Sequence, residues 1–349
     1  MLALNRRAGK RPLPGPAAAR CSGGIFFASC DSMPFRQIIA LDQVVAMIVR
    51  KRQNALALLF AVQGSVLPRI FPQVLCAGMF GLMVAAVHGS HFANVAQYTT
   101  SPFTLLGIAL SLFLGFRNNA AYDRWWEARK QWGRMVYEVR SLARVSEALL
   151  GATHPERREL LVWLSAFGHA LRGGLRERDV RDEVAVVLGE ARAANALAAQ
   201  NPADYCLREM GRSLGRCFET GRIDSQGLRI LDERLTGLAE VQAASERICR
   251  TPLPYAYTLL VHRTAYLYCY LLPFGLVGSM GWFTPLFTAI VAYTFFGLDA
   301  LAEELEQPFG ETANALSLDA ICRTVDISIA EALDEPVPEP LAPVDHILL

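Results

Sequence analysis

Two long stretches without a charged side chain dominate the polarity pattern of this chain. The first runs from Ile70 to Phe116, about 47 residues, and the second from Thr264 to Leu298, about 35 residues. A helix needs about 20 apolar residues to cross a bilayer, so each stretch is long enough for a helical hairpin or nearly so. The pattern therefore predicts four membrane-spanning helices, at about 70–90, 102–122, 255–277 and 282–304.

Polar and helix-breaking residues divide each stretch. In the first, we expect Ser101 to cap the second helix and Pro102 to occupy its first position. In the second, Gly278-Ser-Met-Gly281 interrupts the apolar run and Thr284-Pro285 restarts a helix. Each stretch is thus expected to fold as helix, turn and helix.

Positive charge flanks these spans on one side only. Basic residues precede the first span and follow the second, whereas the two hairpin turns carry no Lys or Arg. The positive-inside rule then places both chain ends in the cytoplasm and predicts a multi-pass protein of the cell (inner) membrane. We expect Trp125, Trp126 and Trp132 to form an interfacial aromatic belt just below the second span.

The remaining segments predict a second, cytosolic part. Residues 123–250 and 316–333 repeat apolar positions at spacings of three and four, which favours helices packed in a bundle, and no alternating strand pattern of any length occurs. Residues 1–46 have no sustained periodic face and are expected to be disordered or a misassigned leader, while 334–349 are expected to form a flexible tail. The predicted fold class is an all-α membrane protein.

Composition narrows the function classes. The hydrophobic fraction is 52%, the charged fraction 19% and the formal net charge +1, which is unusual for a soluble protein and gives no indication of nucleic-acid binding. The eight cysteines include no CxxC pair, and no phosphate loop or nucleophile motif is present. His88 and His91 are three apart and could share a metal, but their loop offers no third ligand, so they are expected to be polar loop residues. We therefore expect no cofactor, no metal and no enzymatic activity.

The second span carries two adjoining stripes, each with a four-residue spacing that places its members on one side of a helix. Small residues allow close helix packing, so the two stripes suit a ring of identical helices in which the small one faces a neighbour and the bulky one the axis. A lipid-facing or buried apolar face is the alternative. The small stripe is Gly107, Ser111 and Gly115, and the bulky stripe is Ile108, Leu112 and Phe116.

Charged and amide side chains follow this span too densely for a lipid-facing helix, so they are expected to form a buried network or a solvated vestibule. The ends of the third and fourth spans meet them on the cytoplasmic side, where we expect Arg263 to pair with Asp299 or Glu303. The candidate network residues are Arg117, Asn118, Asn119, Asp123, Arg124, Arg263, Asp299 and Glu303.

Three sequence blocks together resemble the bestrophin family, in particular its bacterial branch, over residues 47–333. They are Leu114-Gly-Phe-Arg-Asn-Asn-Ala-Ala-Tyr-Asp-Arg-Trp-Trp-Glu-Ala-Arg129, Thr251-Pro-Leu-Pro-Tyr-Ala-Tyr-Thr-Leu-Leu-Val-His-Arg-Thr-Ala-Tyr266 and Glu303-Glu-Leu-Glu-Gln-Pro-Phe-Gly310. The resemblance implies a homopentameric ion channel with four membrane helices and a cytosolic bundle in each subunit. Its partners would be further copies of itself, the lipid bilayer and permeant monovalent ions.

The resemblance also implies site residues. Alignment on Leu114-Gly115-Phe116 places a hydrophobic neck on Ile108, Leu112 and Phe116, the stripe already identified by spacing. A second constriction near the cytosolic exit, usually aliphatic in the family, falls on or near Gln226, just after Asp224.

Two features bear on how such a channel is controlled. The calcium-binding acidic run of eukaryotic members is reduced here to Glu311, and one carboxylate is too few for a site that needs about 6–8 oxygen ligands, so no activation by calcium is expected there. The sequence gives opposing indications of ion selectivity. Eukaryotic relatives pass chloride and other anions, and bacterial ones resemble cation channels. Asp224 favours cations, whereas Arg117 and Arg124 favour anions unless they are paired.

The same features are compatible with other classes of function. A non-conducting membrane scaffold or assembly protein is the main alternative, since the hydrophobic stripe could simply hold subunits together. A secondary transporter predicts inverted repeats, and the two hairpins show no obvious internal similarity.

Overall fold

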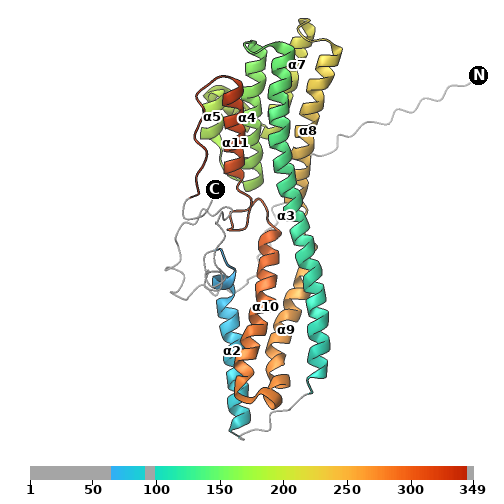
Figure 1. Cartoon of the computed structure of the whole chain (residues 1–349), viewed down its shortest axis with the longest axis vertical. Helices are drawn as coiled ribbons and strands as arrows, with labels where there is room; N and C mark the ends of the chain where they lie inside the picture. Colours follow the sequence, from blue (N-terminus) through green and yellow to red (C-terminus); the bar gives the residue numbers. More distant parts are fainter. Residues whose placement is uncertain (1–63, 91–98, 344–349) are drawn as a thin grey trace, which may run out of the picture. The chain divides into compact units, whose positions relative to one another are not determined.

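The computed structural model describes residues 64–90 and 99–343, so the expectations for 1–46 and 344–349 lie outside the described residues. All regular structure in the described part is helical, which agrees with the predicted fold class (Figure 1). The helices are α2 (Leu67–Gly89), α3 (Ser101–Leu150), α4 (Pro155–Arg176), α5 (Arg181–Leu188), α6 (Glu190–Leu197), α7 (Pro202–Glu219), α8 (Ser225–Arg250), α9 (Tyr255–Met280), the short 3-10 turn η2 (Gly281–Phe283), α10 (Thr284–Leu305) and α11 (Leu318–Ala332).

The apolar stretches form one packed group of helices. Three helical stretches are long and apolar enough to cross a membrane, Leu67–Gly89, Ser101–Leu150 and Tyr255–Leu305. The last is divided by η2 into α9 and α10, which pack against each other and against α2 (Figure 1). Gly281 makes this reversal with φ +50°, a left-handed conformation that glycine adopts without strain.

The predicted turns lie within a few residues of the observed ones. The third apolar helix continues through Gly278 and ends at Met280, so the predicted interruption begins slightly too early. The second apolar helix begins with Ser101 itself, and Thr100 precedes it without a side-chain cap. Pro102 lies in the first turn, as expected.

Helix α3 belongs to both parts of the fold. Its first half packs on α9 and α10, and its second half packs on α8 and α11, without a break over 50 residues. At about 1.5 Å per residue such a helix is about 75 Å long. The sequence pattern placed the end of the second span near residue 122, and the helix simply continues through that point.

The second part of the fold is a helical bundle made by the second half of α3 with α4, α7, α8 and α11. Side chains cap two of its helices: His154 and Asn201 cap α4 and α7 by accepting hydrogen bonds from the backbone N–H groups of Glu156 and Asp204. Its interior is closely packed, and the fully buried side chains include Trp132, Met135, Leu142, Leu160, Leu164, Phe167 and Met210.

The predicted tryptophan belt is wrong for Trp132. This side chain has no exposed surface and packs in the bundle core, with its ring centroid 6.4 Å from that of Phe309. Trp125 is partly buried and its indole N–H donates to the Asn314 carbonyl at 2.9 Å, whereas Trp126 is 46% exposed. The three rings therefore occupy three different environments.

We expect Trp132→Ala to lower the free energy of unfolding by about 3–5 kcal/mol, because it leaves a large cavity in a closely packed core. Trp126→Ala removes the same side chain from an exposed position and is the matched control, with a much smaller effect. Thermal unfolding of the two purified variants measures the difference. Equal loss of stability in both would contradict the assignment of Trp132 to the core.

Candidate pore-lining face and its anchoring network

The two sides of α3 differ in what they contact. Leu110 and Leu114 are buried against α9 and α10, whereas Ile108, Leu112 and Phe116 are 62%, 55% and 55% exposed. These three residues are spaced four apart and so form a single stripe along the helix. Nothing in the described part of the chain covers this stripe. It is an apolar face of a membrane helix available for a bilayer, a neighbour or a pore.

The three residues of the adjoining small stripe have different surroundings. A Cβ added at Gly107 would lie 2.7 Å from the Tyr268 hydroxyl, so Gly107 makes room for α9 of the same chain. Ser111 donates its hydroxyl hydrogen bond back to the Gly107 carbonyl, and Gly115 has open space around its Cα. The expectation that the whole stripe faces a neighbouring subunit is therefore corrected: Gly107 serves packing within the subunit.

Below the apolar stripe, α3 is anchored by the buried side chain of Arg117. Its guanidinium is 1% exposed and forms ion pairs with Asp299 and, at 2.9 Å, with Glu306, both from the end of α10. The second oxygen of Asp299 lies 2.7 Å from Nδ1 of His262 on α9. One carboxylate thus joins three helices.

The predicted partner of these carboxylates is wrong. Arg263 is exposed on α9, Asp299 binds Arg117 and His262, and Glu303 binds Arg69 at 2.6 Å. Consecutive helical residues point about 100° apart, so His262 faces α10 and Arg263 does not. Glu306 was missed as a partner, although its spacing from Asp299 and Glu303 places all three on one side of α10.

Arg124 is the second anchor and binds backbone rather than carboxylates. Its guanidinium donates to the carbonyl of Glu306 at 2.7 Å and to the carbonyls of Ile248 and Thr251. These carbonyls belong to the C-terminal ends of α10 and α8, where unpaired carbonyls concentrate partial negative charge. Arg124 therefore joins the membrane helices to the bundle.

The other predicted network residues remain outside these contacts. Asn118 donates to the Leu114 carbonyl of its own helix at 2.9 Å. Asn119 and Asp123 are exposed, and they continue the stripe from Phe116 at helical spacing. The exposed face of α3 thus changes from apolar to polar just below Phe116.

The two candidate residues of the cytosolic exit lie where α7 turns into α8. Asp224 is the N-cap of α8 and its carboxylate accepts a hydrogen bond from the Gly227 N–H at 2.7 Å. Gln226 is exposed in the first turn of the same helix. The described residues hold no group of three or more His, Cys, Asp or Glu side chains that could bind a metal.

Comparison with known proteins identifies the class. Residues 47–331 match the model of the family described as Bacterial/Fungal Bestrophin protein, so the chain belongs to the bacterial bestrophin family. This confirms the family resemblance seen in the three sequence blocks.

Individual relatives support this family assignment. A voltage-dependent anion channel-forming protein of Mesorhizobium japonicum is 50% identical over 297 residues, which cover 85% of this chain and 95% of the relative. The voltage-dependent anion channel-forming protein YneE of Escherichia coli K12 is 39% identical over 304 residues, 87% of this chain and 100% of the relative. A crystal structure of a bacterial bestrophin homologue from Klebsiella pneumoniae superposes with a TM-score of 0.74 at 36% identity, covering 76% of this chain and 99% of that one. The chain is a bestrophin-family membrane protein and not an enzyme.

The anchoring role of Arg117 is open to a direct test. Removing one partner of a buried ion pair leaves an uncompensated charge, so Arg117→Ala is expected to cost about 3–5 kcal/mol. Arg69→Ala breaks the exposed pair with Glu303, in which the two side chains are 49% and 52% exposed, and is expected to cost about 0–1 kcal/mol. Thermal unfolding in one detergent compares them, and similar losses would refute the anchor.

Proposed function

We propose that five copies of this chain surround an axis and form a channel for small monovalent ions, with α3 of each subunit lining the pore. The observation that carries the proposal is the stripe of Ile108, Leu112 and Phe116, which is exposed whereas Leu110 and Leu114 of the same helix are buried. Kinship with channel-forming relatives and with the Klebsiella pneumoniae homologue supports it. In this arrangement α2, α3, α9 and α10 span the membrane and both chain ends are cytoplasmic.

The stripe would act as a hydrophobic neck. Side chains of Ile, Leu and Phe offer an ion no polar ligand, so an ion passes only when the neck is wide enough to hold water. The polar residues below it, Asn119 and Asp123, would line a wetter vestibule. The ring of Gln226 and Asp224 is proposed as a second constriction at the cytosolic exit.

We further propose that the pore favours cations. Arg117 is neutralised by two carboxylates and Arg124 is engaged by three carbonyls, so neither is free to attract an anion. Along α3, the first exposed charge after Phe116 is that of Asp123, and Asp224 adds a second carboxylate to each subunit near the exit. The names of the relatives favour anion conduction, which is the second candidate.

The neck is tested by Leu112→Ala. Shortening this side chain widens and wets the constriction, so ion flux into liposomes containing the purified protein should rise several-fold. Leu267→Ala is the matched control, because Leu267 is 56% exposed on α9 and lies outside α3, and its flux should equal that of the wild type. Unchanged or lower flux for Leu112→Ala would count against the neck. A pentamer that passes no ion under any condition would support the scaffold alternative.

Selectivity is tested by reversal potentials in a potassium chloride gradient across a planar bilayer. The wild type should reverse near the potassium equilibrium potential. Asp123→Asn and Asp224→Asn should each move the reversal toward that of chloride, and Asn retains the capping ability needed at position 224. Asp182→Asn, on the exposed side of α5, should change nothing. A wild-type reversal near the chloride potential would establish the anion alternative.

A further inference from the structure

A cavity of about 480 Å³ lies in the helical bundle between α4, α5, α11 and the segment that follows α11. No residue of α3 lines it, so it is separate from the candidate pore face. Its volume is typical of small-molecule sites, which span about 300–1,000 Å³. The apolar part of its wall is aliphatic, contributed by Val162, Val187, Ile329 and Leu333. No Phe, Tyr or Trp side chain lines it, so it offers no ring on which a nucleobase could stack.

The polar part of the wall contains the partly buried carboxylate of Asp326. Asp326 accepts a hydrogen bond from the Ser165 hydroxyl at 2.7 Å and faces Nε2 of His169 at 3.1 and 3.2 Å. Burial opposes ionisation of Asp326, but the contacts with His169 and Ser165 and the positive charge of Arg323 outweigh it, and the pKa of this carboxyl is lowered. Asp326 is therefore ionised, and Ser165, His169 and Arg323 stabilise its charge.

The two guanidinium groups of the wall differ. Arg158 pairs with Glu335 at 2.5 Å, and Glu183, a third carboxylate of the wall, pairs with Arg172. Arg323 is partly buried and forms no ion pair with any described residue. Arg323 is therefore the guanidinium of the wall that forms no ion pair with a described carboxylate, and its positive charge also helps to keep Asp326 ionised.

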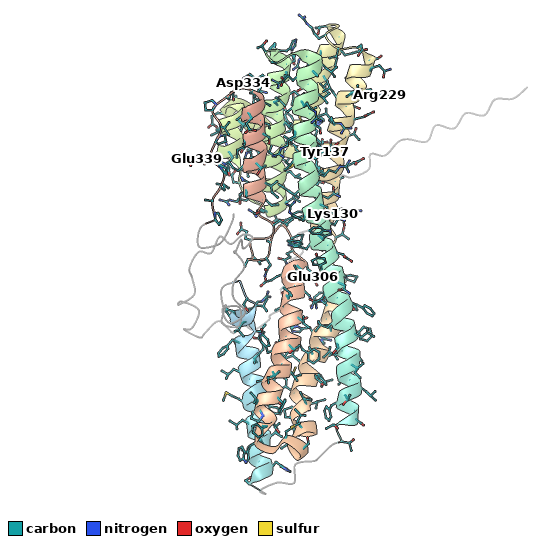
Figure 2. All side chains as sticks on the ribbon, viewed as in Figure 1. Lys130, Tyr137, Arg229, Glu306, Asp334 and Glu339 are labelled. Atoms are coloured by element: carbon teal, nitrogen blue, oxygen red, sulfur yellow. The ribbon has the colours of Figure 1, made fainter. Side chains whose placement is uncertain are left out.

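The chain itself closes one side of the cavity. Asp334 has φ +54°, and the N–H of Glu335 donates to the Ala330 carbonyl at 2.9 Å, which turns the chain sharply at the end of α11. Pro336 and Pro338 then line the cavity as the segment runs back (Figure 2 labels Asp334 at this turn and Glu339 farther along). Glu335 thereby pairs with Arg158, whose side chain is 61% exposed.

We propose that this cavity binds a small aliphatic monocarboxylate, with its carboxylate on Arg323 and its hydrocarbon chain along Val187 and Ile329. A single guanidinium without an ion-pair partner matches one negative charge. Three carboxylates in the wall oppose a doubly charged phosphate, and the aliphatic surface favours a hydrocarbon chain over a planar ring.

The probe is hexanoate, added to the full-length protein in lipid nanodiscs and followed by isothermal titration calorimetry, with empty nanodiscs measured for partitioning. Saturable binding is expected. Arg323→Gln should weaken it by about tenfold or more, because the charge-assisted contact is lost. Glu335→Gln should tighten it several-fold, because it releases Arg158 to attract the anion.

Two controls separate this site from general attraction. Arg229→Gln removes an exposed positive charge on α8, outside the cavity, and should leave the affinity unchanged (Figure 2). Hexylamine has the same chain with the opposite charge and should not compete. The proposal is overturned if no saturable binding occurs, if Arg323→Gln binds within about twofold of the wild type, if Glu335→Gln does not tighten binding, or if hexylamine competes. The opposite signs expected for the two variants exclude a mere loss of folding.

Discussion

The burial of the Arg117 guanidinium is the constraint on which the rest of the structure depends. A charge with 1% exposure among apolar helices is tolerable only if opposite charges reach it, and Asp299 and Glu306 do so from α10. This requirement fixes the rotation of α3 relative to α10, and His262 adds α9 through the same carboxylate. Once that rotation is fixed, Leu110 and Leu114 must face inward, and the stripe that begins at Ile108 must face outward.

Arg124 imposes a second constraint of the same kind, which links the membrane helices to the bundle. It lies seven residues after Arg117, close to two helical turns, so both side chains leave α3 on the same side and both reach Glu306, one at its carboxylate and the other at its carbonyl. Since Arg124 also holds the end of α8, the rotation set by Arg117 is passed to the bundle through an unbroken helix. The cavity near Arg323 is remote from this joint along the chain, although α11 also packs on α3.

Much of this fold follows from local patterns, while the choice of partners does not. The apolar helices, their turns and the exposed stripe of α3 are readable from the sequence because hydrophobicity and helical spacing determine them. Arg117 and Arg263 are equally plausible partners for Asp299 in sequence, and only the rotation of α9 decides between them. Trp126 and Trp132 likewise differ only in which side of α3 meets the bundle, and Gly107 differs from Gly115 only in the presence of Tyr268.

The continuity of α3 limits which insertions and deletions this chain could accept during evolution. Inserting or deleting a single residue between Phe116 and Arg124 would rotate everything below it by about 100° and slide it by about 1.5 Å. The apolar stripe that ends at Phe116 and the guanidinium of Arg124 could then no longer both keep their present orientations. A loop absorbs such a change at little free-energy cost, but an uninterrupted helix transmits it. The length of this segment is therefore free to change only by steps close to whole helical turns.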